Sequence, residues 1–284
     1  MKKVVAPLAA LLATSVFLFA ACGDGGSGGK DAEGIEIPTV APADFKDAAP
    51  PTIVDGVIYY PSIDGNLYAV DIASGTEKWR VTTGGQIRSR PAVADGVVYF
   101  GSNDANLYAV DQETGEEVFT FVARDDVFSS PIVVDGMVYF GSFDHKIYAV
   151  DAKTGEEKWN LPSFGVVSNT PLVHEGLVLS GSGDATLYAL DIDTGEPVWR
   201  VKKGRLASMR YASPTLVDGL VVYGTGNNSL YAADVKTGEE VWRYETRDDF
   251  ENPYGPLPAA EGLIYVGGND GKFRALNAKT GDEK

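Results

Sequence analysis

The sequence is poor in cysteine and histidine. Its 284 residues include one cysteine, Cys22, and two histidines, His145 and His174. A single cysteine excludes an intramolecular disulfide framework and a thiolate zinc cluster. A histidine site would need convergent partners that the sequence does not show, so both histidines are interpreted as surface residues. We therefore expect no metal site.

Basic residues are also scarce relative to acidic ones. The chain has 24 Lys and Arg against 40 Asp and Glu, a formal net charge of −16. Loss of residues 1–21, argued below, removes Lys2 and Lys3 and no acid, which takes the charge to −18. A surface of this charge repels the phosphates of nucleic acids, so we expect no nucleic acid as partner.

One long apolar run is present, and it lies at the N-terminus. Lys2 and Lys3 precede an apolar stretch that ends in small residues just before Cys22. A positive start, an apolar stretch and small residues at its end are typical of a secretory signal. A transmembrane anchor is the alternative, but the run ends in a cleavage pattern rather than in basic residues. Residues 1–21 are therefore predicted to be a signal peptide.

The residues around Cys22 add a second signal. Phe19-Ala20-Ala21-Cys22 resembles the bacterial lipobox, with Phe19 where the motif usually has Leu. The resemblance implies cleavage before Cys22 and a diacylglycerol on its sulfur. The protein is then exported and lipid-anchored to a bacterial membrane, at its periplasmic face or on the cell surface. The glycine-rich residues 22–34 are predicted to form a flexible tether.

Sustained helical periodicity is missing from the remaining chain, and internal repetition takes its place. Six copies of one turn begin with an Asp or Asn, and a Gly follows four residues later in each. The spacings between copies are 40, 40, 40, 43 and 43 residues. The six starting positions are Asp71, Asp111, Asp151, Asp191, Asp234 and Asn277.

Each copy reads as four short strands. In residues 128–164, strands are expected over 128–134, 137–142 and 146–151, and a fourth begins at Glu157. Asp135-Gly136 fits a two-residue hairpin turn, in which glycine supplies a positive φ. The repeated Asp, such as Asp151, is expected to accept backbone N–H groups of its own turn. Residues 35–284 are therefore predicted to be an all-β β-propeller of four-stranded antiparallel blades, with six blades visible.

The blades share the pattern Ala-x-Asp-x-x-Thr-Gly-x-x-x-Trp, which resembles the tryptophan-docking motif of propellers of the pyrroloquinoline-quinone (PQQ) type. The resemblance covers about residues 50–284 and implies that each aromatic ring packs between adjacent blades. Use of the rings to stack a ligand is the alternative, but repeated positions serve architecture better than one site. The docking positions are Trp79, Phe119, Trp159, Trp199 and Trp242.

The copies differ most in the connections between one blade and the next. Two of these connections are longer than the others, and six of the ten arginines lie in such segments. In a propeller they emerge on one face, so they predict a locally basic mouth for an anionic partner or ligand. Solvated loop charge is the alternative interpretation. The candidate binding residues are Arg88, Arg90, Arg124, Arg205, Arg210, Tyr211, Arg247 and Tyr254.

Three function classes compete. The chain is similar to the lipoprotein propeller subunit of the outer-membrane β-barrel assembly machinery, which implies a non-catalytic scaffold that docks envelope proteins and has no cofactor. A PQQ-dependent dehydrogenase shares the blade motif, but its calcium-binding carboxylates and adjacent cysteines have no counterpart here, so neither PQQ nor calcium is expected. A surface propeller that senses a small ligand is the third class. We expect no catalytic residues.

The sixth copy stops one residue before its docking position, so its outer strand is missing. The segment Ile35–Val40 lies where an outer strand would precede the first blade and could complete the sixth. Against this, Pro38 removes a backbone donor. The other explanation is that the chain is a C-terminally truncated piece of a seven- or eight-bladed protein, and we favour it.

Overall fold

The computed structural model describes residues 49–204, 213–226, 229–245, 256–267 and 271–284. The regular secondary structure of these residues is entirely β. Within the same ranges, no helix is long and apolar enough to cross a membrane. The predicted signal peptide, the tether and the segment 35–40 lie outside the described residues.

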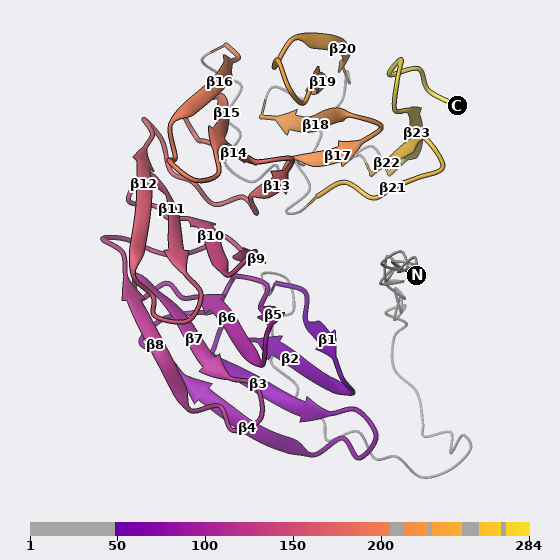
Figure 1. The fold of residues 1–284 in the computed structure, drawn as a ribbon. Helices are drawn as coiled ribbons and strands as arrows, with labels where there is room; N and C mark the ends of the chain where they lie inside the picture. Colours follow the sequence, from indigo (N-terminus) through magenta and orange to yellow (C-terminus); the bar gives the residue numbers. More distant parts are fainter. Residues whose placement is uncertain (1–48, 205–212, 227–228, 246–255, 268–270) are drawn as a thin grey trace, which may run out of the picture. The chain divides into compact units, whose positions relative to one another are not determined.

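In the described residues, twenty-three strands form six sheets, which follow one another along the chain (Figure 1). The first strands of the sheets are β1 (Thr52–Val54), β5 (Ala92–Ala94), β9 (Ile132–Val134), β13 (Leu172–His174), β17 (Thr215–Val217) and β21 (Ala259–Ala260). The second strands are β2 (Val57–Pro61), β6 (Val97–Gly101), β10 (Met137–Gly141), β14 (Leu177–Gly181), β18 (Leu220–Thr225) and β22 (Leu263–Gly267).

The third strands are β3 (Asn66–Asp71), β7 (Asn106–Asp111), β11 (Lys146–Asp151), β15 (Thr186–Asp191), β19 (Ser229–Asp234) and β23 (Phe273–Asn277). The fourth strands are β4 (Glu77–Thr82), β8 (Glu117–Val122), β12 (Glu157–Pro162), β16 (Pro197–Lys202) and β20 (Glu240–Glu245). Each sheet is an antiparallel meander in chain order, so each sheet is one propeller blade.

Blades 1 to 5 have four strands and blade 6 has three, which confirms the predicted six-bladed pattern with an incomplete last blade. Glu283 forms an isolated antiparallel bridge with Leu276, and Lys284 N–H donates to the carbonyl of Ala275 at 2.9 Å. Glu77 pairs with Val70 in the same way in blade 1. Residues 283–284 therefore occupy the position at which a fourth strand begins.

The turns form as the sequence predicts. Asp135 and Gly136 both have positive φ, 49° and 76°, which is the geometry of a type I′ hairpin turn. In the following turn, Asp151 Oδ1 accepts the backbone N–H groups of Lys153 and Thr154, both at 3.0 Å. The repeated Asp thus satisfies the turn locally, and the same contacts recur from blade to blade.

The predicted start of the first strand was wrong. Strand β9 begins at Ile132 rather than at residue 128. Pro131 has no N–H to give to a ladder, and the residues before it belong to the connection from blade 2. Strand β11 and the starts of β10 and β12 match the prediction, and β10 ends at Gly141, one residue earlier than predicted.

The hydrophobic core lies between blades rather than within them. The described side chains form five buried clusters, and each joins one blade to the next. The cluster between blades 1 and 2 combines Tyr59, Leu67 and Trp79 with Val98 and Phe100. Burial of this apolar surface is the main force that holds neighbouring blades together.

Candidate functional site

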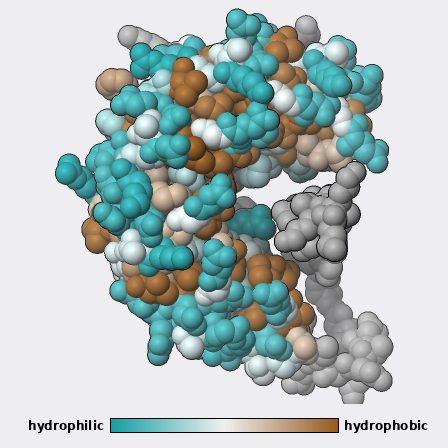
Figure 2. Space-filling model, in the orientation of Figure 1, coloured by the Kyte–Doolittle hydropathy of each residue, from teal (hydrophilic) through white to brown (hydrophobic). Residues whose placement is uncertain are grey.

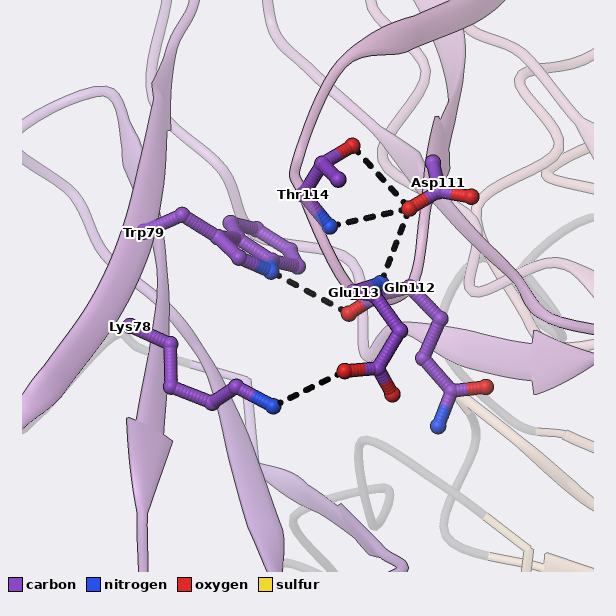
Figure 3. A network of polar contacts seen from close by, with 6 residues as sticks. All are labelled: Lys78, Trp79, Asp111, Gln112, Glu113 and Thr114. Atoms are coloured by element: carbon purple, nitrogen blue, oxygen red, sulfur yellow. Dashed lines mark hydrogen bonds and ion pairs between the residues drawn. The ribbon is translucent and has the colours of Figure 1, made fainter.

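The tryptophan at each docking position lies against the next blade. Trp79 Nε1 donates to the carbonyl of Gln112 at 3.1 Å (Figure 3). A Cβ added to Gly115 would approach the Trp79 ring to 2.8 Å, so only glycine lets the ring come this close. Lys78 pairs with Glu113 at 3.1 Å beside the ring. The equivalent indole bonds join Trp159 to Ile192, Trp199 to Val235 and Trp242 to Ala278.

Phe119 occupies the same place in blade 2 but has no N–H to donate. Its ring still covers a glycine of the next blade, since a Cβ on Gly155 would meet it at 2.5 Å. The carbonyl of Ala152 would otherwise lack the donor that an indole supplies. Tyr99 Oη of blade 2 donates to this carbonyl at 2.8 Å. Burial of the ring raises the pKa of Tyr99 to about 12, so the donor keeps its proton at physiological pH.

The blade connections pack on the loops between second and third strands. Backbone N–H groups of Asn103, Phe143 and Gly183 donate to connection carbonyls of Gln86, Asp126 and Val166, all at 2.9 Å. We call the surface formed by connections 83–91, 123–131 and 163–171 and loops 102–105, 142–145 and 182–185 the connection face. These repeated backbone bonds fix the connections, so their side chains stand on a defined framework.

Arg88 is the described candidate that contacts an aromatic side chain on this face. Its guanidinium carbon lies 5.9 Å from the centre of the Phe128 ring, and its Nε donates to Gln86 Oε1 at 2.8 Å. Phe128 in turn stacks on Phe143, with ring centres 5.7 Å apart. A cation beside two stacked rings is an arrangement suited to a partner that offers both charge and apolar surface.

Arg90 and Arg124 do not join this group. Arg90 lies beside the inner strands, because its backbone N–H donates to Ser130 Oγ at 2.9 Å and its Nε to Thr52 Oγ1 of β1 at 3.2 Å. Arg124 is exposed, and its N–H donates to Asp144 Oδ2 at 3.2 Å. The structure therefore separates the three described arginines. The other candidates, Arg205, Arg210, Tyr211, Arg247 and Tyr254, lie outside the described residues, as does Cys22.

Acidic side chains close to Arg88 moderate its charge. Asp126 has a raised pKa, chiefly because it is partly buried, and the carboxylates of Asp125 and Asp104 raise it further. The Arg88 guanidinium opposes this rise. The described part of the connection face is therefore not uniformly basic, and cation and acid alternate across it.

Two features of this face escaped the sequence analysis. Phe164, in the connection after blade 3, is 83% exposed. In blades 1 to 4 an aspartate accepts a hydrogen bond from the hydroxyl of a tyrosine four residues later. In blade 3, Asp144 Oδ2 accepts the hydroxyl of Tyr148 at 2.5 Å, and its Oδ1 accepts the backbone N–H of Lys146 at 3.1 Å. The pairs are Asp64–Tyr68, Asp104–Tyr108, Asp144–Tyr148 and Asp184–Tyr188. Because these aspartate–tyrosine pairs recur every 40 residues, the sequence alone could have revealed them.

These aspartates order the loops of the connection face. Asp104 Oδ2 also accepts the N–H of Gly84 at 2.7 Å, which ties one connection to the next blade. Burial, and then the Asp104 carboxylate, raise the pKa of Tyr108 to about 12. Among the described residues, no group of three or more His, Cys, Asp or Glu side chains is placed to hold a metal ion.

Comparisons with known proteins, by sequence family and by structure, give results that agree. The family model described as outer membrane protein assembly factor BamB matches residues 63–164, 126–248 and 162–284. The crystal structure of BamB from Moraxella catarrhalis has a TM-score of 0.71 at 21% identity, over 84% of this chain and 72% of that one. The computationally designed protein Ika8 has a TM-score of 0.68 at 18% identity, over 82% and 71% of the two chains.

Identities this low show the fold alone, and a search of curated proteins gives no match. The family model, by contrast, recognises sequence, and its segments together span residues 63–284. That span includes the docking residues, the connection face and the incomplete sixth blade. On this evidence the chain is a β-propeller that belongs to the BamB family of outer membrane protein assembly factors.

Proposed function

We propose that this chain is a non-catalytic propeller that docks envelope proteins through its connection face and is held at a membrane by a lipid on Cys22. Membership of a family described as an outer membrane protein assembly factor is the observation that carries the proposal. The connection face supports it, since Arg88, the Phe128–Phe143 pair and exposed Phe164 stand on a framework of backbone bonds. Exposed apolar and cationic side chains on rigid loops are typical of protein-docking surfaces.

Affinity capture tests the docking face. Membranes of the source organism are solubilised, and proteins retained by the wild-type chain are compared with those retained by Arg88→Glu and Phe164→Ser. We expect each variant to lose about tenfold in partner affinity, the cost of one anchor contact of about 1.4 kcal/mol. Val241→Ser is the matched control, because Val241 is 50% exposed but lies on outer strand β20.

Stability separates docking from folding in this experiment. Phe164 is exposed and Arg88 is half-buried on a connection, so the free energy of unfolding measured with urea should change by no more than about 0.5 kcal/mol. Retention of the same partners by all three variants would contradict docking on the connection face. The double variant Arg205→Glu with Arg210→Glu extends the test to the predicted residues of the blade 4 connection.

The anchor has its own test. The lipobox-like residues before Cys22 motivate it. Cys22→Ser should abolish incorporation of labelled fatty acid and release the chain from the membrane fraction, because a thioether-linked diacylglycerol needs the sulfur. Unchanged membrane retention at unprocessed size would instead indicate an uncleaved N-terminal anchor.

A quinoprotein dehydrogenase is the second candidate, because it shares the repeat motif. Titration of the purified chain with PQQ and calcium, followed by absorbance and calorimetry, distinguishes the two classes. The proposed scaffold binds neither. Stoichiometric binding of the quinone together with calcium would replace the scaffold with the enzyme class.

A further inference from the structure

Strand β8 is the outer edge of blade 2. It pairs with β7 from Val122 opposite Asn106 to Glu117 opposite Val110, with a bulge near Val118. In the described part of the chain β8 pairs with no other strand, because the sheet order is β5-β6-β7-β8. Its second edge therefore offers a row of backbone N–H and C=O groups for pairing.

The other complete blades protect this edge, and blade 2 does not. Natural edge strands are commonly blunted by Lys, Arg or Pro. Strand β4 contains Lys78 and Arg80, and β12 contains Lys158 and Pro162. Strands β16 and β20 contain Arg200 and Arg243. Strand β8 reads Glu-Val-Phe-Thr-Phe-Val and has none of the three.

The unprotected edge is also apolar. Val122 is 71% exposed and Val118 is 43% exposed. Thr120, between them, has a buried hydroxyl without a hydrogen-bond partner in the structure. Figure 2 shows separate hydrophobic spots among hydrophilic surface in the region where Figure 1 draws β7 and β8. Apolar side chains beside free backbone groups favour association through this strand.

The charges at the two ends of β8 indicate which strand would fit. Glu116 and Glu117 precede the apolar stretch, and Arg124 follows it. If two copies of β8 pair antiparallel about a two-fold axis near Thr120, the acidic end of each strand comes close to Arg124, just beyond the basic end of the other. Opposite charges close together across a strand pair are stabilising, and the two-fold axis supplies this proximity twice.

We propose that β8 is a self-association edge, through which a second copy of this chain adds its own β8 to form an antiparallel pair. A short strand pair buries far less surface than the roughly 1,200–2,000 Å² of a stable complex, so the association is weak, with a Kd of about 10⁻⁵–10⁻³ M. Because β8 is an outer strand, its pairing edge lies apart from Arg88, Phe128 and Phe164, and Arg124 at its end is the residue that it shares with the connection face.

Sedimentation equilibrium of the full chain with Cys22→Ser tests the proposal, since neither a lipid nor a disulfide can then join two copies. The double variant Val118→Lys with Val122→Lys places lysines where other blades already carry them, as at Lys78 and Lys202. The matched control is Val198→Lys with Val241→Lys, at exposed valines of β16 and β20. We expect at least about tenfold weaker dimerisation for the β8 variant and no change for the control.

A chain that stays monomeric up to about 1 mM, or a control that weakens dimerisation as much as the β8 variant, overturns the proposal. Charge reversal tests the antiparallel register. Arg124→Glu should weaken the dimer about fivefold, because it sets like charges close together twice. Adding Glu116→Arg should restore wild-type affinity, and failure to restore it rules out this pairing.

Discussion

The interface between blades 1 and 2 and the interface between blades 2 and 3 solve one packing problem in two ways. In the first, Trp79 fills the space over Gly115 and also donates to the carbonyl of Gln112. In the second, Phe119 fills the space over Gly155, and Tyr99 donates to the carbonyl of Ala152. Ring packing and hydrogen bonding are therefore separable roles of the docking position.

The comparison also explains a buried hydroxyl. Tyr59 stands in blade 1 where Tyr99 stands in blade 2, and its ring lies 5.8 Å from that of Trp79. Its hydroxyl is buried and makes no hydrogen bond to the carbonyl of Gln112, which accepts the indole N–H instead. The same tyrosine is thus packing alone in one blade and packing plus donor in the next.

Loss of a docking ring should have the largest effect. Trp159→Ala removes a ring that contacts Gly195 and donates to the carbonyl of Ile192 at 2.9 Å. We expect a loss of about 3–5 kcal/mol in the free energy of unfolding, from lost burial and a cavity between blades. Urea unfolding followed by far-UV circular dichroism measures it. A variant with unchanged stability would mean that the ring does not dock the blades.

Removal of one hydroxyl sharpens the comparison between the two interfaces. Tyr99→Phe should cost about 1–3 kcal/mol, because the carbonyl of Ala152 is left buried without a donor. Tyr59→Phe is the matched control and should change stability by less than about 0.5 kcal/mol, since its hydroxyl is not the donor to a carbonyl of the next blade. The same urea experiment compares them.

A repair of blade 2 completes this test. Phe119→Trp in the Tyr99→Phe background returns an indole N–H to the interface, and we expect it to recover most of the lost stability. Equal effects of Tyr99→Phe and Tyr59→Phe would contradict the exchange of roles between tyrosine and tryptophan.

The smallest expected effect is on stability at acid pH. Backbone N–H groups of Lys153 and Thr154 lower the pKa of Asp151 in the folded chain. A lowered folded pKa gives stability that is complete above the unfolded value, about 3.9, and is lost as pH falls through the folded value. Asn277 makes the equivalent turn with an amide oxygen, accepting the N–H of Lys279 at 2.9 Å.

Asp151→Asn should therefore keep stability at pH 7 close to that of the wild type and reduce its loss below about pH 4. Thermal melts at pH 7 and pH 3 check this. An equally steep acid loss in the variant would show that this turn contributes nothing to acid sensitivity.

The repeated turns and strands were readable from the sequence because their contacts are local. Asp151 bonds to groups two and three residues away, and Asp135-Gly136 closes a turn by itself. The start of the first strand was misread, because Pro131 cannot join a ladder and the apolar residues before it serve the connection face instead. Alternation predicts a strand but does not reveal which neighbour its apolar side chains meet.

The sequence by itself determined the blade, since short-range turns and two-residue alternation repeat with a constant period. Only the tertiary structure decided which side chains work together across blades. Trp79 and its acceptor are 33 residues apart, and Arg88 reaches Phe128 while Arg90, two residues on, bonds to Thr52. Such pairs depend on how one blade stacks on the next, and that geometry is set by burial of many side chains at once rather than by any local pattern.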